Sequence, residues 1–240
     1  MSAFTELDPS ATDLSLAALV GDPGRHYYGV YPAVVTDNQD PNGEGRVRIR
    51  LPWAPDPGSA EFSPWARLAT LNAGNNRGSW FVPEVDDEVL VGFGGGDPRD
   101  PYVVGSLWNG RDSAPEKMDA DNNVRSLTSR SGIKITLDDT RGSVTLTLTT
   151  PGGQQVELTD AGNKVTVSDS NGNSLELAPG GVSLTAASKL SISAPTINID
   201  CGSANVTSAM WSYSGVIQCS AAIATSVVGT SYTPGAGNIW

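Results

Sequence analysis

The chain has few positive charges, one histidine, two cysteines and no long hydrophobic run. Its 240 residues contain 15 Lys and Arg against 26 Asp and Glu, which gives a formal net charge of −11. A nucleic-acid partner requires a surface rich in Lys and Arg, so this balance argues against one. No stretch of about 20 apolar residues is present, and this excludes a membrane-spanning helix.

The scarcity of reactive side chains narrows the chemistry further. Cys201 and Cys219 cannot form a disulfide framework or a zinc site, and we expect each to be a small buried hydrophobe. His26 is the only histidine, so a histidine-based metal site or a Ser-His-Asp triad is not expected. We therefore predict a non-enzymatic protein with no catalytic residue, no cofactor and no metal. The N-terminus lacks a basic segment before its short apolar run, so we expect synthesis in the cytoplasm without a signal peptide.

The chain is rich in glycine and poor in charged residues. Gly accounts for 27 of 240 residues, and charged residues make up only 17% of the chain. Together with plentiful Ser, Thr, Val and Asn, this composition favours strands and tight turns over helices. We predict an all-β protein with five segments: an N-terminal arm (1–26), an OB-fold (27–110), a linker (111–124), a β-helical shaft (125–230) and a C-terminal apex segment (231–240).

Short strand patterns separated by turn residues run from residue 27 to 110. The segment 46–51 alternates charged and apolar residues, which places Val47, Ile49 and Leu51 on one face and Arg46, Arg48 and Arg50 on the other. Such a series of short antiparallel strands suits a small Greek-key barrel such as the OB-fold. Strands are expected at 30–36, 46–51, 65–71, 78–82, 88–93 and 103–107.

Beyond residue 123 the pattern becomes a repeat of one short strand and one tight turn. Turn sequences rich in Gly and Asn supply the positive φ that sharp corners need; they lie at 151–153, 161–163, 171–173 and 179–181. One chain offers few inward side chains per strand, so we expect three chains to wind together, each strand finding its neighbours in the other two. The apolar pairs are Ile133/Ile135, Val144/Leu146/Leu148, Val156/Leu158, Val165/Val167, Leu175/Leu177, Val182/Leu184, Leu190/Ile192 and Ile197/Ile199.

Four blocks of the barrel region and the start of the repeat carry a family resemblance. The blocks are Trp65-Ala66-Arg67, the run from Gly78 to Phe93, the run from Gly96 to Pro101, and the run from Val104 to Gly110. Together with Ser131-Gly132-Ile133-Lys134 and Pro151-Gly152-Gly153, they resemble the VgrG / phage baseplate assembly protein V family. The resemblance implies the central spike of a contractile tail or injection system, a homotrimer that punctures the target cell envelope.

The resemblance also implies partners and a location. They are a baseplate hub protein, a PAAR-type tip protein and a transiently contacted target membrane, in a phage baseplate or an injection particle. The large hub region of full-length VgrG proteins does not precede the barrel here, so a separate hub protein is expected. No inserted lysozyme domain fits between Gly110 and Asn123, and a His-X-His iron site at the apex is not expected. The predicted hub contacts are Leu14, Leu16, Leu19 and Val20, and the predicted tip contacts are Tyr232, Pro234, Ile239 and Trp240.

Several motifs admit a second interpretation. Asp86-Asp87-Glu88 and Asp138-Asp139 are residue types used in catalysis or calcium binding, but they adjoin turns, where Asp caps backbone N–H groups. Gly94-Gly95-Gly96 lacks the Lys-Ser/Thr of a phosphate loop, and we interpret it as a hairpin turn. The three arginines of 46–50 are expected to contact acidic partner surfaces or carboxylates of neighbouring subunits. The alternatives are a trimeric tail-fibre-like protein that binds or cleaves glycans, and an OB-fold binding module on a stalk.

Overall fold

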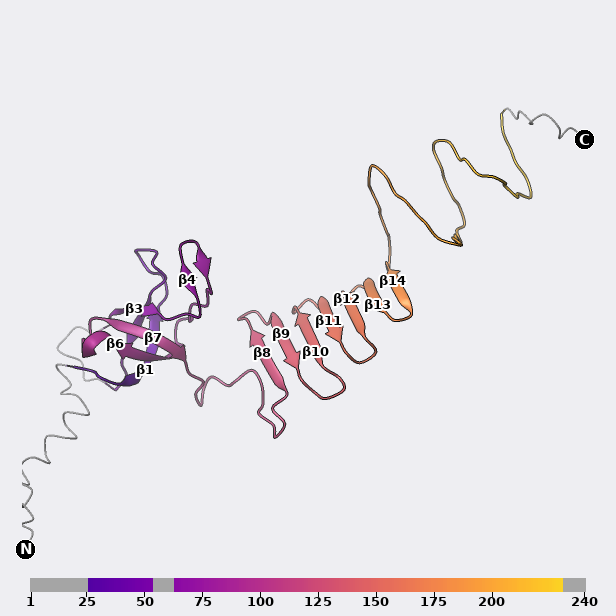
Figure 1. Cartoon of the computed structure of the whole chain (residues 1–240). Helices are drawn as coiled ribbons and strands as arrows, with labels where there is room; N and C mark the ends of the chain where they lie inside the picture. The colour runs from indigo at the N-terminus through magenta and orange to yellow at the C-terminus, as the bar shows by residue number, and fades with distance from the viewer. Residues whose placement is uncertain (1–25, 54–62, 231–240) are drawn as a thin grey trace, which may run out of the picture. The chain divides into compact units, whose positions relative to one another are not determined.

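The computed structural model describes residues 26–53 and 63–230. Within them the regular elements are strands and one 3₁₀ turn, η2 (Gly94–Gly96). The strands form a closed barrel, a seven-stranded sheet and a two-stranded ribbon (Figure 1). The predicted all-β class with an OB-like barrel is confirmed, and the large antiparallel sheet that follows the barrel is consistent with the predicted β-helix.

The barrel contains five strands in the order β1-β2-β3-β7-β6. All of its pairings are antiparallel except the one between β3 and β7, which closes the barrel with parallel strands. The sequence prediction placed these strands correctly to within a few residues. Their bounds are β1 (Val30–Asp37), β2 (Val47–Arg50), β3 (Trp65–Leu68), β6 (Glu88–Phe93) and β7 (Pro101–Ser106).

The barrel core is built from alternating residues of these strands. Val47 and Ile49 of β2 are 0% exposed, and they pack with Val35, Val89 and Val91. Arg48 lies between them on the outer face, where its Nε donates a hydrogen bond to the carbonyl of Ser63 at 3.0 Å. The predicted division of segment 46–51 into an apolar inner face and a charged outer face is confirmed.

The strand expected at 78–82 is absent. The chain instead forms the ribbon β4 (Ala73–Gly74) and β5 (Arg77–Gly78), and residues 79–84 follow without a ladder partner. Gly78 has φ of +151°, and the amide of Ser79 donates to the carbonyl of Asn72, so the ribbon ends at this point. Trp80 stays 75% exposed. Trp80, Phe81 and Val82 are residue types that favour strands, and for this reason the sequence predicted one. Their backbone has no neighbouring strand to pair with.

The repeat forms one antiparallel sheet in the order β14-β13-β12-β11-β10-β9-β8. Each strand pairs with its neighbours in sequence, so the expectation that every strand is flanked by other chains is wrong for this part of the shaft. The reason is the length of the connections: turns of a few residues join successive strands as hairpins. The strands are β8 (Val124–Thr128), β9 (Lys134–Asp138), β10 (Thr145–Thr149), β11 (Gln155–Thr159), β12 (Lys164–Ser168), β13 (Ser174–Ala178) and β14 (Gly181–Thr185).

The turns of this sheet use the predicted residues. Gly153, Gly162 and Gly172 have φ of +80°, +79° and +87°, and Asn163 has φ of +50°. Gly adopts such angles without steric cost, and Asn tolerates them better than most residues. The prediction that Gly and Asn make the corners is confirmed.

The chain divides into two compact units between Lys189 and Leu190. In the second unit, residues 190–230 are extended and form no strand within the chain. The pairs Leu190/Ile192 and Ile197/Ile199 therefore belong to no ladder here. Cys201 and Cys219 are both exposed, so the expectation that they are buried is wrong for the single chain.

Candidate functional site: the apolar face of the sheet

The register of the sheet brings the apolar residues of the repeat together. Residues directly opposite each other in an antiparallel pair point to the same side. Leu146 lies opposite Leu137 and Leu158, and Leu148 lies opposite Ile135 and Val156. Continued across all seven strands, this register gives fourteen positions, of which thirteen are aliphatic. These thirteen residues, called the apolar face below, are Leu127, Ile135, Leu137, Leu146, Leu148, Val156, Leu158, Val165, Val167, Leu175, Leu177, Val182 and Leu184.

Among the described residues, no second layer covers the apolar face. Leu148 is 39% exposed, Val167 42% and Leu184 57%. A strand or sheet gains stability by burying its hydrophobic side against another layer, and contiguous apolar patches of this kind are rare on monomers. The apolar face is therefore the side of this sheet that lacks a covering layer within the described residues.

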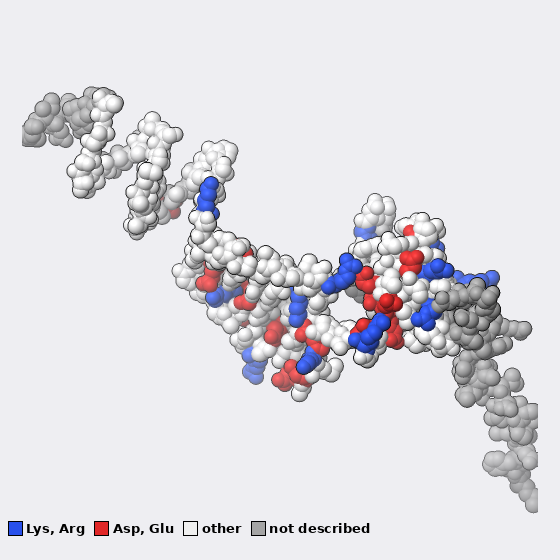
Figure 2. Space-filling view, turned by 180° about the vertical axis from the view of Figure 1, so that it is seen from behind, with Lys and Arg blue, Asp and Glu red and all other residues white. Residues whose placement is uncertain are grey.

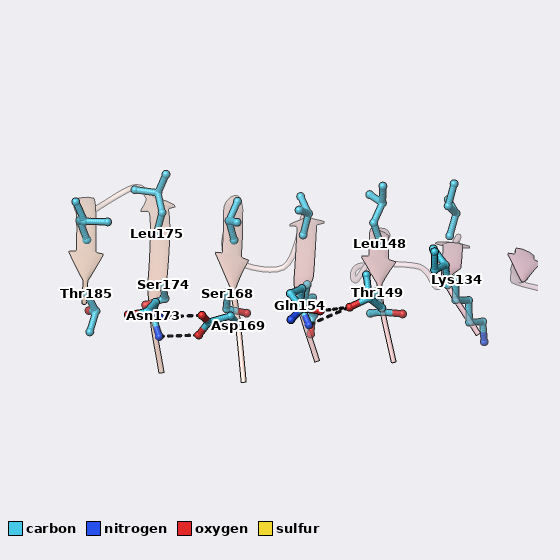
Figure 3. A pocket seen from close by; sticks show the side chains of 17 residues that line it. Lys134, Leu148, Thr149, Gln154, Ser168, Asp169, Asn173, Ser174, Leu175 and Thr185 are labelled. Atoms are coloured by element: carbon cyan, nitrogen blue, oxygen red, sulfur yellow. Dashed lines mark hydrogen bonds between the residues drawn. The ribbon is translucent and has the colours of Figure 1, made fainter. Parts of the chain in front are cut away.

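One row of the apolar face lines a shallow groove of about 590 Å³. Leu148 and Leu175 project from their strands into it, and Asp169 and Asn173 of the β12–β13 turn, joined by hydrogen bonds, border it (Figure 3). The aliphatic row is thus bordered by polar turns. This arrangement suits a flat apolar contact and offers no convergent set of polar groups for a small ligand.

The other side of the sheet is mostly polar; its exceptions are Val124, Ala178 and Gly181 at the strand ends. Its central row comprises Ser126, Thr136, Thr147, Glu157, Thr166, Glu176 and Ser183. Lys164 Nζ pairs with Glu176 Oε2 across neighbouring strands at 2.8 Å, and this contact raises the pKa of Lys164. This polar side is suited to water, which leaves the apolar face as the side to be covered.

The fourteenth position, Arg125 of β8, marks the end of the apolar face. Its guanidinium forms an ion pair with Asp139 and also donates to the carbonyl of Asn123. The aliphatic rows thus stop at the strand that follows the linker. The sequence analysis missed Leu127, because the alternate position before it holds Arg125 and not a second aliphatic residue. It chose Ile133, which lies before β9, in place of Leu137.

The carboxylates singled out by sequence serve turns and ion pairs. Asp138 accepts hydrogen bonds from the amide and hydroxyl of Thr140, which lower its pKa. Asp87 accepts the amide of Glu84 at 2.8 Å, and Glu88 accepts the side-chain amide of Asn109 at 2.8 Å. The interpretation as turn chemistry is confirmed for Asp87 and Asp138, whereas Asp139 forms an ion pair with Arg125.

The glycine run at the β6–β7 connection is also a turn. Gly95 and Gly96 have φ of +58° and +81°, and the amide of Asp97 donates to the carbonyl of Gly94. The predicted hairpin turn is confirmed.

The arginines of the barrel find partners within the chain. Arg46 Nη2 lies 2.8 Å from Asp40 Oδ1, and its Nε lies 3.2 Å from Glu44 Oε2. The hydrogen bonds from Arg46 hold the pKa of Asp40 well below its usual range. The expectation that Arg46 pairs with a neighbouring subunit is corrected by this contact, which fixes the β1–β2 turn.

Metal-ligating clusters and long apolar helices are both absent from the described parts of the chain. In residues 26–53 and 63–230, no group of three or more His, Cys, Asp or Glu is placed to hold a metal ion. The same ranges contain no helix of the length and apolarity that a membrane span requires. The predicted hub contacts (Leu14, Leu16, Leu19, Val20) and tip contacts (Tyr232, Pro234, Ile239, Trp240) lie outside the described residues.

Comparison with known proteins agrees with the barrel. Residues 31–108 match the family model of the type VI secretion system/phage-baseplate injector OB domain. The chain is 28% identical over 123 residues to the type VI secretion system spike protein VgrG1b of Pseudomonas aeruginosa, covering 48% of this chain and 17% of that protein. It is 31% identical over 135 residues to VgrG1a of the same organism, covering 53% and 20%.

A third relative comes from another organism. The chain is 33% identical over 108 residues to the spike protein VgrG3 of Vibrio cholerae, covering 45% of this chain and 9% of that protein. The matched region thus spans a fifth or less of the length of these curated relatives. The chain is a partial VgrG-like sequence, and its relatives are spike proteins of secretion machinery.

Proposed function

We propose that this chain is a non-enzymatic, homotrimeric central spike of a contractile tail or injection system. The barrel attaches it to the baseplate, and the shaft leads into the target cell envelope. The observation that carries the proposal is the apolar face, which follows a barrel of the injector type in the sequence and has no cover within the described residues. Three copies placed around one axis would bury this face and leave the polar side of each sheet in water.

The chemistry of the surface supports a mechanical role. A spike that crosses an envelope must expose little apolar area, and the net charge of −11 disfavours adhesion to anionic lipid. Hydrogen-bonded ladders with tight turns also resist local opening. The carboxylates occupied in turns provide no support for glycan cleavage, which requires a free pair facing a substrate groove.

The partners follow from the same role. We propose a separate baseplate hub that contacts the arm at Leu14, Leu16, Leu19 and Val20. We further propose a PAAR-type tip protein that contacts Tyr232, Pro234, Ile239 and Trp240. The protein would then reside in a phage baseplate or an injection particle and touch the target membrane only during contraction.

Copy number per particle tests the proposal. A spike lies on the axis of the machine, so particles purified from the source organism should contain three copies, counted by mass spectrometry with isotope-labelled peptides. A tail fibre lies at the periphery and is present in many copies. A count well above three, or absence from the particles, would contradict the spike role.

The apolar face provides a matched pair of variants for the same assay. Val167→Asp places a charge on the apolar face, and Thr166→Asp places the same charge on the polar side one residue away. The first variant should be missing from particles and abolish their activity. The second should be incorporated at three copies.

A further inference from the structure

A second groove, of about 1330 Å³, lies on the barrel beside the ribbon β4–β5. It is called the ribbon groove below, and its lining includes Arg67, Leu71, Arg77, Trp80 and Phe81. Leu71 is 99% exposed, and Trp80 and Phe81 are largely exposed as well. Aromatic residues and arginine are enriched where proteins contact one another, and exposed apolar patches of this kind are rare on monomers. The ribbon groove therefore has the composition of a contact surface.

The ribbon groove is positively charged although the chain as a whole is acidic. Within the described residues, neither Arg67 nor Arg77 forms an ion pair with a carboxylate, whereas Arg46 and Glu44 in the same lining pair with each other. Elsewhere on the barrel, basic side chains lie beside acidic ones (Figure 2). The two unpaired guanidinium groups favour an occupant that brings carboxylates together with apolar side chains.

One wall of the ribbon groove also offers free backbone groups. The amide of Ser79 donates to the carbonyl of Asn72, and after it no backbone amide or carbonyl of residues 80–82 hydrogen-bonds to another described residue. A backbone with free amides and carbonyls can accept a further strand, in which case backbone hydrogen bonds supply affinity and side-chain contacts supply specificity. An extended peptide segment is thus the kind of occupant that this wall suits.

The arm of this chain contains a segment of that chemistry. Residues 1–24 include four carboxylates and no Lys or Arg, although the arm lies outside the described residues. Two of the carboxylates, Asp13 and Asp22, flank the apolar run of the arm. That run contains Leu14, Leu16, Leu19 and Val20.

The described chain begins within reach of the ribbon groove. The amide of Tyr27 donates to the carbonyl of Gly96 at 2.7 Å, which fixes the start of the described chain beside η2. The Tyr102 ring lies against the other end of η2, and Arg67 Cζ lies 5.5 Å from the centre of that ring. Residues 20–25 can span about 20 Å when extended, so the arm can pass Tyr102 and reach Arg67.

We propose that residues 13–22 fold back onto the barrel of their own chain and occupy the ribbon groove. Asp22 pairs with Arg67 and Asp13 pairs with Arg77, because the path from η2 meets Arg67 before the ribbon. The apolar run between the two carboxylates covers the exposed aromatic side chains. Its backbone pairs with the free amides and carbonyls of residues 80–82.

The inference goes beyond the spike proposal and does not depend on it. It concerns the free protein, in which the arm shields an apolar groove from other molecules. The apolar residues of the arm are also those proposed to contact a hub. The hub and the ribbon groove would therefore compete for the arm, and docking of the spike on the hub would uncover the groove.

Hydrogen exchange of the full-length protein, purified alone and read by mass spectrometry, tests the arm contact. Peptides that cover 13–20 and 80–82 should exchange about tenfold or more slowly than an unpaired chain. Arg77→Glu should remove the protection of both segments, because it places a carboxylate opposite Asp13. Arg141→Glu makes the same change at an exposed turn of the sheet and should leave both segments protected.

A charge exchange separates a direct contact from a local disturbance of the ribbon. Arg77→Asp combined with Asp13→Arg should restore slow exchange in both segments, because the two charges are only swapped. Failure of this double variant to restore protection would contradict the pairing of Asp13 with Arg77. Arm peptides that exchange freely in the wild-type protein, or that stay protected in Arg77→Glu, would overturn the inference and leave the spike proposal standing.

Discussion

The strands of the barrel and of the sheet both alternate apolar and polar residues. Their apolar side chains nevertheless differ greatly in how far they are buried. Val47 and Ile49 in β2 are fully buried, because the five strands close on themselves and enclose a core. Leu148 and Val167 in the sheet remain about 40% exposed, because seven strands in one layer enclose nothing. The two regions differ in whether their strands close into a barrel, and not in how hydrophobic the strands are. A closed barrel buries its own apolar side chains, whereas an open single-layer sheet leaves one side without cover.

The difference indicates how stability is divided. The barrel can gain its hydrophobic free energy within one chain, at about 25 cal/mol for each Å² of apolar surface buried. The sheet can gain this contribution only when its apolar face is covered, so its stability depends on protein concentration. In the proposed trimer, the polar side of each sheet would remain in contact with water.

A charge on the apolar face should have the greatest effect on the association of copies. In a trimer, Val167→Asp would bury three carboxylates, one from each chain. Each unpaired buried ion costs several kcal/mol. We expect complete loss of the trimer, with the barrel still folded, as measured by light scattering and near-ultraviolet circular dichroism. Thr166→Asp should remain trimeric. A trimeric Val167→Asp would show that the apolar face is not the contact.

A cavity in the barrel core should destabilise the barrel independently of protein concentration. Ile49→Ala should lower the free energy of unfolding of the barrel by about 2–5 kcal/mol, because Ile49 is enclosed within one chain. This loss should be the same at low and high protein concentration in urea titrations. Val167→Ala should instead act on a transition that moves with concentration. Equal concentration dependence for both variants would contradict the distinction.

Two glycines of the sheet turns isolate a backbone effect. Gly142 has φ of +82° and open space around it, whereas Gly180 has open space and ordinary φ. Gly142→Ala should destabilise the sheet by about 1–2 kcal/mol through φ alone. Gly180→Ala should be neutral or stabilise by up to about 1 kcal/mol, because it restricts the unfolded chain. Thermal unfolding at one fixed concentration measures both, and identical shifts would rule out the φ argument.

The stability of the sheet should depend weakly on pH in the acid range through Asp169. The side-chain amide of Asn173 and nearby backbone amides lower the pKa of Asp169 from 3.8 to about 2. Because the folded-state pKa is depressed, the stabilisation is fully present above pH 3.8 and is lost as the pH falls toward 2. Asp169→Asn should weaken the acid dependence of sheet unfolding, whereas Asp40→Asn should affect the barrel. Unchanged acid titrations of the sheet would refute this role of Asp169.

Local chemistry explains what the sequence could predict. Alternation identified the strands of the barrel and sheet, and Gly-Asn corners identified the turns, because both are set by neighbours a few residues apart. The segment 78–82 was misjudged because its aromatic residues favour strands while Gly78 and the ribbon β4–β5 remove the ladder partner. Arg46 was misassigned because its carboxylate, Asp40, lies across a turn whose geometry the spacing alone does not reveal.

Local sequence patterns do not determine which strands of the repeat pair with each other. The same Val and Leu pairs would suit a sheet flanked by other chains or a hairpin meander within one chain, since both place alternate residues on one side. The structure gives the second arrangement for β8–β14 and leaves residues 190–230 unpaired. The difference arises from turn length, because connections of a few residues return the chain at once to its own preceding strand.

The most direct test is the solution mass of the purified full-length chain, measured by light scattering on a sizing column. We predict a mass three times the chain mass of 24.9 kDa, with a hydrodynamic radius larger than that of a compact protein of that mass. A monomer of 24.9 kDa that stays folded and soluble at high concentration would contradict the central claim that the apolar face joins copies of this chain.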